Sequence, residues 1–219
     1  MKIRPLPLGP YETNCYLVDC GDGIGVIVDP GDECERIVSV LNELRLTPAA
    51  ILLTHGHLDH ISAVPDLLTV YPNLPVRISN ADLDWCFSGK NRLPGYREVL
   101  QKPATAESIA DGDVLSFGSV RMQVLATPGH SPGSVCFLAQ DTADSGDGRP
   151  EVLFSGDTLF AGSIGRVDFY GGDERAMGNS LRRLAALSPA TVVLPGHGCD
   201  STVRRECRTN PYLQFSHMA

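Results

Sequence analysis

Cysteine motifs are missing from this sequence of 219 residues. None of its seven cysteines forms a Cys-x-x-Cys pair, and their positions follow no regular spacing: Cys15, Cys20, Cys34, Cys86, Cys136, Cys199 and Cys207. An odd number of scattered cysteines argues against a disulfide framework and against a cysteine-ligated zinc site. We expect reduced thiols, most of them packed in the interior, as in a cytosolic protein.

Long apolar segments are also missing. No stretch approaches the roughly 18 consecutive apolar residues that a membrane-spanning helix requires. The first residues, MKIRPLPLGPYETN, include a lysine and an arginine, but no apolar segment follows them as it does in a secretory signal. The sequence therefore predicts a cytoplasmic protein without a membrane partner.

Basic residues are too few for a nucleic-acid-binding surface. The sequence has 18 Lys and Arg against 26 Asp and Glu, which gives a formal net charge of −8. Because proteins that bind nucleic acid usually carry a basic face, this balance argues against a nucleic-acid partner. The composition leaves the oligomeric state open.

Apolar periodicity and turn residues divide the sequence into strands and helices. In the first half they predict a hairpin over 13–30, a helix over 33–45, a buried strand over 49–53, a helix over 64–71, a strand over 75–79 and an irregular connection beside the site over 88–106. In the second half they predict a hairpin over 113–127, strands over 134–139 and 151–155 around an exposed loop over 141–150, a helix over 173–187, a strand over 191–194 and a helix over 200–209. This order is typical of mixed sheets covered by helices. No linker rich in Pro, Gly or Ser divides the chain, so we expect one domain over residues 1–219.

Potential metal ligands gather where four predicted strands end. The segment ILLTHGHLDH (51–60) runs from a buried strand directly into a group of four: His55, His57, Asp59 and His60. Three shorter segments repeat the form of an apolar strand, a glycine and a polar residue: TPGH ending at His130, FSGD ending at Asp157 and LPGH ending at His197. This recurrence predicts a metal site.

The spacing of these residues indicates more than one ion. Residues i and i+2 of an extended segment point the same way, so His55 and His57 can reach one ion together. Asp59 and His60 follow as the chain turns, and their different directions suit a second ion. Gly56 removes a side chain that would crowd the backbone between the two histidines. Imidazole nitrogen and carboxylate oxygen, without thiolate, suit zinc, iron or manganese.

Three other residues with potential ligand groups are not assigned to the metal site. Cys199 follows His197 by two positions, but imidazoles and carboxylates already complete the ligand set, so it is interpreted as an ordinary thiol. His217 belongs to no strand-end motif and is interpreted as a surface residue. Asp29 follows a predicted strand at a turn and is interpreted as a turn former.

The motifs THGHLDH, TPGHSPGSVCF, LFSGDTLF and VVLPGHG together resemble those of the metallo-β-lactamase fold hydrolases, and among them the glyoxalase II group. The resemblance extends over nearly the whole chain, from NCYLVD to RTNPYL. It implies an α/β fold, the αββα sandwich of two mixed β-sheets flanked by helices, with metals along one edge of the sheets. It also implies two divalent metal ions, most often zinc, with iron or manganese as alternatives. The first ion would be held by His55, His57 and His130 and the second by Asp59, His60 and His197, with Asp157 bridging both.

The same resemblance implies hydrolysis of a small-molecule thioester, and S-lactoylglutathione is the first substrate that it suggests. A hydroxide that bridges the two ions would attack the carbonyl, and Asp59 would orient the water or move its proton. True β-lactamases of this fold usually lack the bridging carboxylate, so Asp157 argues against that activity. Arg166 lies where the long glyoxalase II enzymes place a basic residue, and either receives a substrate carboxylate or pairs with Asp168 or Asp173.

Other activities of the same fold stay open. Long glyoxalase II enzymes carry a helical C-terminal extension for glutathione, whereas only about twenty residues follow His197 here, as in the short single-domain branch. The motifs overlap with those of mononuclear iron persulfide dioxygenases, which use the first-metal ligands and oxygen. A lactonase and a non-catalytic metal-binding module are further alternatives, although the complete ligand set argues against the last.

Overall fold

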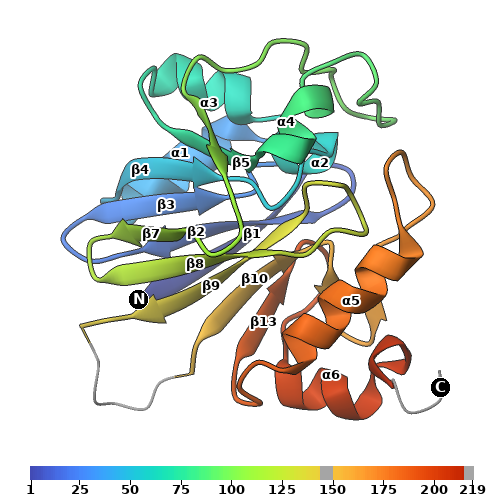
Figure 1. Cartoon of the computed structure of the whole chain (residues 1–219). Helices are drawn as coiled ribbons and strands as arrows, with labels where there is room; N and C mark the ends of the chain where they lie inside the picture. The colour runs from blue at the N-terminus through green and yellow to red at the C-terminus, as the bar shows by residue number, and fades with distance from the viewer. Residues whose placement is uncertain (144–149, 215–219) are drawn as a thin grey trace.

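Two six-stranded sheets face each other at the centre of the protein (Figure 1). The structure is a computed structural model that describes residues 1–143 and 150–214. The first half of the chain forms one sheet, with its strands in chain order: β1 (Lys2–Leu8), β2 (Thr13–Asp19), β3 (Ile24–Val28), β4 (Thr47–Leu52), β5 (Val76–Ser79) and β6 (Ala106–Ile109). The strands β1 to β3 pair antiparallel, and β3 to β6 pair parallel.

The second half of the chain forms the other sheet. Its strands lie in the order β14 (Ser201–Thr202), β13 (Val192–Pro195), β10 (Val152–Gly156), β9 (Val135–Asp141), β8 (Val120–Ala126) and β7 (Val114–Phe117). The strands β10 and β13 pair parallel, and the other neighbours pair antiparallel. Two short strands form a separate ribbon: β11 (Leu159–Phe160) and β12 (Ser163–Ile164). Both large sheets are therefore mixed, as the sequence predicts.

Helices cover the outer faces of both sheets. One side carries α1 (Cys34–Glu43), α2 (Leu58–Ile61), α3 (Val64–Val70) and α4 (Asn80–Cys86), and the other carries α5 (Glu174–Ala185), α6 (Val203–Thr209) and the 3₁₀ turn η1 (Pro211–Leu213) (Figure 1). No helix of the described residues is long and apolar enough to cross a membrane.

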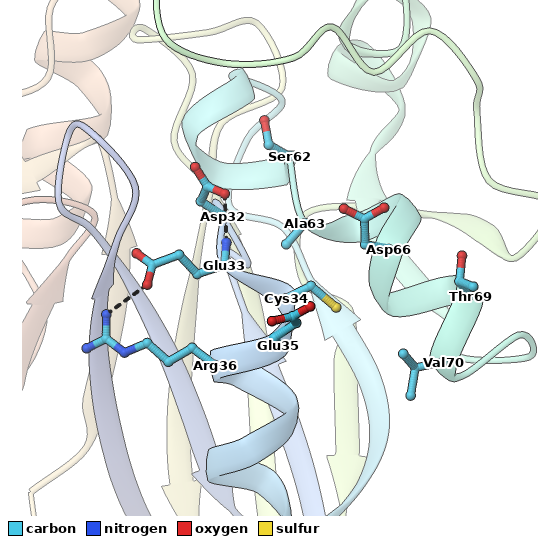
Figure 2. A pocket seen from close by; sticks show the side chains of 10 residues that line it. All are labelled: Asp32, Glu33, Cys34, Glu35, Arg36, Ser62, Ala63, Asp66, Thr69 and Val70. Carbon is cyan, nitrogen blue, oxygen red and sulfur yellow. Dashed lines mark hydrogen bonds and ion pairs between the residues drawn. The ribbon is translucent and has the colours of Figure 1, made fainter.

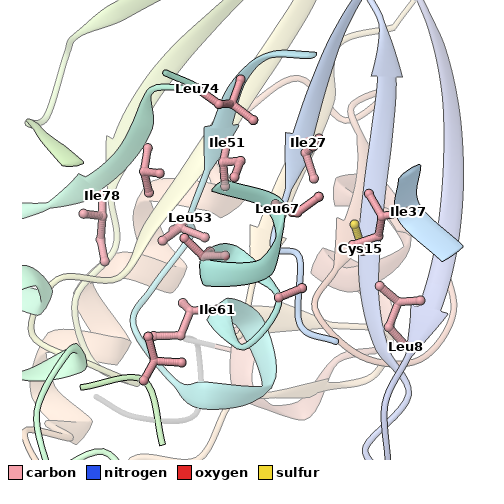
Figure 3. Packing of buried hydrophobic residues seen from close by; sticks show 14 of the residues in the cluster. Leu8, Cys15, Ile27, Ile37, Ile51, Leu53, Ile61, Leu67, Leu74 and Ile78 are labelled. Carbon is pink, nitrogen blue, oxygen red and sulfur yellow. The ribbon is translucent and has the colours of Figure 1, made fainter. Parts of the chain in front are cut away.

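Alternation along the strands divides the core into layers. In the first sheet Ile27 and Ile51 face outward and pack in one cluster with Ile37 of α1 (Figure 3). Their neighbours Val26 and Leu52 belong to the cluster between the two sheets. Successive residues of a strand point to opposite faces, so each central strand supplies both layers. A third cluster joins the second sheet to α5 and α6, which completes the predicted αββα sandwich.

Most predicted elements are present, and the differences have local causes. The last helix begins at Val203 rather than at residue 200, because residues 201–202 pair with β13 and the Thr202 side chain caps the helix. The sequence interpretation missed β1, whose Pro5 and Pro7 are tolerated because this strand lies at the edge of the sheet. It also missed α4, which has only seven residues. Most of the predicted loop over 141–150, together with His217, lies outside the described residues.

Candidate metal centre

All seven predicted ligands lie at one edge of the two sheets. Four of them follow β4 of the first sheet, and the other three follow strands of the second: His130 after β8, Asp157 after β10 and His197 after β13. Because β10 and β13 run parallel, their carboxyl ends meet at this edge. The fold thus brings together residues that are far apart in the sequence.

Three histidines form a triplet suited to one ion. One ring nitrogen from each of His55, His57 and His130 lies within 4.8 Å of the others. The closest approach joins His57 Nδ1 to His130 Nε2, 2.9 Å apart. His55 and His130 are buried, and His57 is partly exposed. This is the set that the resemblance assigns to the first metal.

A second triplet consists of Asp59, His60 and His197, each of which has a ligand atom within 4.8 Å of those of the other two. Asp59 Oδ2 lies 3.2 Å from His197 Nε2 and 3.7 Å from His60 Nε2. Asp157 touches both triplets: its Oδ1 lies 3.3 Å from His60 Nε2, and its Oδ2 lies 3.5 Å from Nε2 of both His130 and His197. The Asp157 carboxylate therefore has the location expected of a bridging ligand.

Asp29 orients the ring of His60, and Thr54, which is bonded to Asp29, orients the ring of His55. His60 Nδ1 lies 3.0 Å from Asp29 Oδ2, and His55 Nδ1 lies 3.1 Å from the Thr54 hydroxyl. Thr54 in turn donates to Asp29 through its hydroxyl at 2.6 Å and its backbone N–H at 2.8 Å. A hydrogen bond at Nδ1 leaves Nε2 directed into the cluster, an arrangement typical of metal-binding histidines.

Backbone carbonyls orient two more rings. His130 Nδ1 lies 2.7 Å from the carbonyl oxygen of Arg166, and His197 Nδ1 lies 3.2 Å from that of Tyr11. A carbonyl oxygen only accepts, so each Nδ1 carries the proton and each Nε2 presents a lone pair to the cluster. His57 has the opposite orientation and presents Nδ1 to His130.

Three buried polar atoms of the cluster have no hydrogen-bond partner among the described residues: His55 Nε2, His60 Nε2 and Asp157 Oδ1. An unpaired buried polar group costs about 1–3 kcal/mol, so such atoms are rare and demand an explanation. All three belong to the predicted ligand set, and imidazole nitrogen with carboxylate oxygen suits zinc, iron or manganese. The residues present fit a metal centre.

At His55, His57, Asp59 and Asp157 the electrostatic environment favours the protonation states that metal binding needs. At His60 and His197 the neighbouring carboxylates outweigh burial and raise the pKa, so a metal ion would displace a proton there. Burial lowers the pKa of His55 well below its ordinary value and lowers the pKa of His57 to about 4, so both rings are neutral at pH 7. For Asp59 and Asp157 burial acts to raise the pKa, but the neighbouring histidines together outweigh it, and the pKa of both carboxyls is lowered. Neutral imidazoles and ionised carboxylates are competent ligands.

Glycine allows the strand ends to approach one another this closely. A Cβ on Gly196 would lie 2.2 Å from Asp157 Oδ1 and 2.7 Å from His60 Cε1. A Cβ on Gly56 would lie 2.4 Å from the Cβ of Cys86 on α4. The prediction that Gly56 prevents crowding is therefore confirmed, and the crowding neighbour is a helix that the sequence interpretation did not include.

Arg166 is tied to its own neighbours. Its guanidinium donates to both carboxylate oxygens of Asp168, at 2.8 and 2.7 Å, and lies over the Phe169 ring at 4.1 Å. The Phe169 ring packs against those of His57 and His130, with centroids 5.4 and 5.9 Å apart. Of the two interpretations from the sequence, the ion pair with Asp168 is present, and contact with a substrate stays a prediction.

The interpretation of Asp29 as only a turn former is wrong. Its left-handed φ of 50° does suit a turn, but its buried carboxylate orients Thr54 and His60. Asp29 directly follows β3, the neighbour of β4, so it repeats the strand-end pattern of the ligands and could have been found by that signal. A second buried carboxylate, Asp82 on α4, was missed because α4 itself was missed.

A pocket of about 600 Å³ lies elsewhere, between the start of α1 and α3 (Figure 2). Ten residues line it: Asp32, Glu33, Cys34, Glu35, Arg36, Ser62, Ala63, Asp66, Thr69 and Val70. None of them is a histidine or a member of the triplets. This acidic pocket is separate from the candidate metal centre.

An αββα sandwich with five histidines and two aspartates gathered at one sheet edge defines a metal-dependent enzyme. A family model described as the metallo-β-lactamase superfamily matches residues 8–197. The chain belongs to this superfamily, and it is a metal-dependent hydrolase with a His/Asp metal-binding site.

Two relatives and two solved structures resemble almost the whole chain. Probable metallo-hydrolase YqgX of Bacillus subtilis is 38% identical over 97% of this chain and 98% of the relative. Hydroxyacylglutathione hydrolase GloC of Haemophilus influenzae is 32% identical, with the same coverage. The structure of BLEG-1, a B3 metallo-β-lactamase, is 38% identical, with a TM-score of 0.85 over 97% of this chain and 100% of that chain. TTHA1623, in a di-iron-bound form, is 39% identical, with a TM-score of 0.78 over 96% and 100%.

Proposed function

We propose that the protein is a dinuclear metal-dependent hydrolase that cleaves a glutathione thioester such as S-lactoylglutathione. The observation that carries the proposal is the Asp157 carboxylate, which lies within 3.5 Å of histidines from both triplets. A carboxylate shared in this way suits a pair of ions rather than one. The similarity to GloC supports the choice of substrate.

Divalent ions would make water a nucleophile near neutral pH and would polarise the thioester carbonyl. Each triplet would hold one ion, and Asp157 would contact both ions. We propose zinc as the metal, with iron as the alternative because the similar protein TTHA1623 has a di-iron-bound form. Thr13 Oγ1 donates to Asp59 Oδ2 at 3.2 Å and so fixes that carboxylate. We assign Asp59 the orientation of the attacking water and the acceptance of its proton. The products are a carboxylic acid and a thiol.

Arg166 is our candidate for contact with a substrate carboxylate. Exposed ion pairs contribute little to stability, so a ligand carboxylate can compete with Asp168 at small cost. We expect Arg166→Gln to raise KM for S-lactoylglutathione with little change in kcat, measured by steady-state kinetics. An unchanged KM would leave the arginine with a structural role only.

Metal analysis of the purified protein together with thioester turnover tests the proposal. We expect about two metal ions per chain and release of glutathione from S-lactoylglutathione. His55→Ala and Asp157→Ala should both abolish turnover, whereas Asp66→Ala, in the acidic pocket of Figure 2, should not. A fully active Asp157→Ala protein would exclude the bridging role.

Hydrolysis of a β-lactam is the second candidate, because BLEG-1 is 38% identical over nearly the whole chain. A chromogenic cephalosporin assayed beside the thioester separates the two activities. One iron per chain with oxygen uptake on glutathione persulfide would instead support a dioxygenase. Turnover of a lactone alone would support a lactonase.

A further inference from the structure

A buried carboxylate behind the cluster has no part in the chemistry described above. Asp82, in the first turn of α4, has an exposed fraction of 0%. Its Oδ1 accepts from the Gly133 N–H at 2.7 Å and from Trp85 Nε1 at 3.1 Å. Its Oδ2 accepts from the Gly56 N–H at 2.9 Å and from the Ser131 hydroxyl at 2.6 Å. Four donors fix the orientation of this carboxylate.

Three of these four donors lie in the two loops that carry the first triplet, and the fourth, Trp85, lies on α4 itself. Gly56 stands between His55 and His57, and Ser131 and Gly133 follow His130. One side chain therefore joins the loop after β4, in the first sheet, to the loop before β9, in the second. The packing is equally close, since a Cβ on Gly133 would lie 2.6 Å from the Asp82 backbone nitrogen.

Asn91 holds the Gly56 backbone from its carbonyl side. Its Nδ2 donates to the carbonyl oxygen of Gly56 and to that of Cys86, at 2.8 Å each. Gly56, the residue between the two histidines, is thus fixed at its N–H by Asp82 and at its carbonyl by Asn91. Neither side chain is among the ligands.

We propose that Asp82 is a positioning residue that sets the separation of His57 from His130 and thereby the metal affinity of the first triplet. The inference rests on the proposed function only in requiring that this triplet binds a metal. The two rings sit on separate loops with nitrogens 2.9 Å apart, so their spacing depends on what holds the loops together. In Asp82→Asn an amide NH₂ replaces one acceptor oxygen and faces two donors, so one of the two loop contacts is lost.

Zinc titration of metal-free protein against a competing chromophoric chelator measures the effect. The wild type should bind two equivalents, and Asp82→Asn should bind one of them about 10–100-fold more weakly while the other is unchanged. A His197→Ala protein, which lacks a ligand of the second triplet, identifies which equivalent belongs to which triplet. The absorption bands of cobalt(II) bound to the first triplet should also change in Asp82→Asn, because its ligand geometry changes.

Glu206→Gln is the matched control. The Glu206 side chain is also 0% exposed and accepts from the Gly162 N–H at 2.7 Å and from Asn210 Nδ2 at 2.9 Å, but it lies on α6, away from the triplets. We expect it to lower the unfolding temperature and to leave both zinc affinities unchanged. Equal loss of metal in both variants would overturn the proposal, because the effect would then follow general stability.

Ser131→Ala keeps the proposal testable if Asp82→Asn does not fold. It removes one of the four donors, and we expect the same equivalent of zinc to weaken by a smaller factor. Wild-type affinity for both equivalents in whichever of these variants folds would overturn the positioning role. A protein that shows the predicted metal effects but cleaves no thioester would overturn the proposed substrate and support this inference.

Discussion

A methyl group added at residue 196 should disable the cluster while the rest of the fold persists. The Cβ of Gly196→Ala would lie 2.2 Å from Asp157 Oδ1, whereas ordinary contacts of a Cβ begin at 3.4 Å. The oxygen and the new methyl group must therefore separate by a further 1.2 Å, the difference between these two distances. His60 Cε1, at 2.7 Å, limits movement on that side.

The backbone cannot easily absorb this displacement. The Gly196 N–H donates to the Gly156 carbonyl at 2.9 Å, and the Gly196 carbonyl accepts from the Asn14 N–H at 2.7 Å. The Asp157 carboxylate must then move instead. A misplacement of about 1 Å costs about 100-fold in rate, which corresponds to about 2.7 kcal/mol of transition-state stabilisation. We expect kcat/KM to fall at least that far and the metal content to fall with it.

Steady-state hydrolysis of S-lactoylglutathione and metal analysis of the same preparations measure this effect. Gly178→Ala is the control, because the nearest atom to the added methyl group, Arg182 Nη1, is 3.9 Å away and the site is inside α5. Alanine there should raise the free energy of unfolding by about 0.5–1 kcal/mol and leave activity unchanged. Wild-type metal content and activity in Gly196→Ala would refute the reasoning.

Three further predictions concern the surroundings of the cluster. Asp29→Asn should lower the free energy of unfolding by about 1–3 kcal/mol, measured in urea, because it disturbs the buried bonds to Thr54 and His60; an unchanged stability would contradict their role. Trp85, the single tryptophan, has its ring 5.4 Å from that of His57, so cobalt(II) added to metal-free protein should quench its fluorescence; bound cobalt without quenching would place the ion elsewhere. Burial raises the pKa of Cys136 from 9.0 to about 11, so between these pH values the unfolded chain loses a proton that the folded protein keeps. Between these pH values the thiol should therefore lower the free energy of unfolding by about 1.4 kcal/mol for each pH unit. Cys136→Ala should make this free energy, measured by denaturant unfolding at several pH values, fall less steeply with pH. An identical dependence on pH in both proteins would be evidence against the shift.

The location of the site could be predicted from the sequence because its signals are local. His55 and His57 are separated by one glycine at the end of an apolar run, and Gly129, Gly156 and Gly196 mark the other three strand ends. Each signal lies within about four consecutive residues, so no knowledge of tertiary contacts is needed. The mixed sheets followed from hairpins and strand–helix alternation in the same way.

The residues that support the ligands could not be predicted, because their roles arise from contacts between distant segments. Asp82 meets Ser131 across 49 positions, and Asn91 reaches back to the Gly56 carbonyl. Neither belongs to a periodic pattern, since α4 is short and the segment over 88–105 is irregular, with turns and bends. The same holds for Arg166, whose backbone carbonyl, rather than its side chain, touches His130.

Each half of the chain builds one sheet, and each triplet draws two members from the first half and one from the second. A bound ion would therefore be a crosslink between the halves, closing a loop of chain as a covalent bridge does and reducing the freedom of the unfolded state. Two separately expressed fragments divided between β6 and β7 would each hold an incomplete ligand set. Metal would then promote their association, and hydrolase activity would measure how much of the complex had formed.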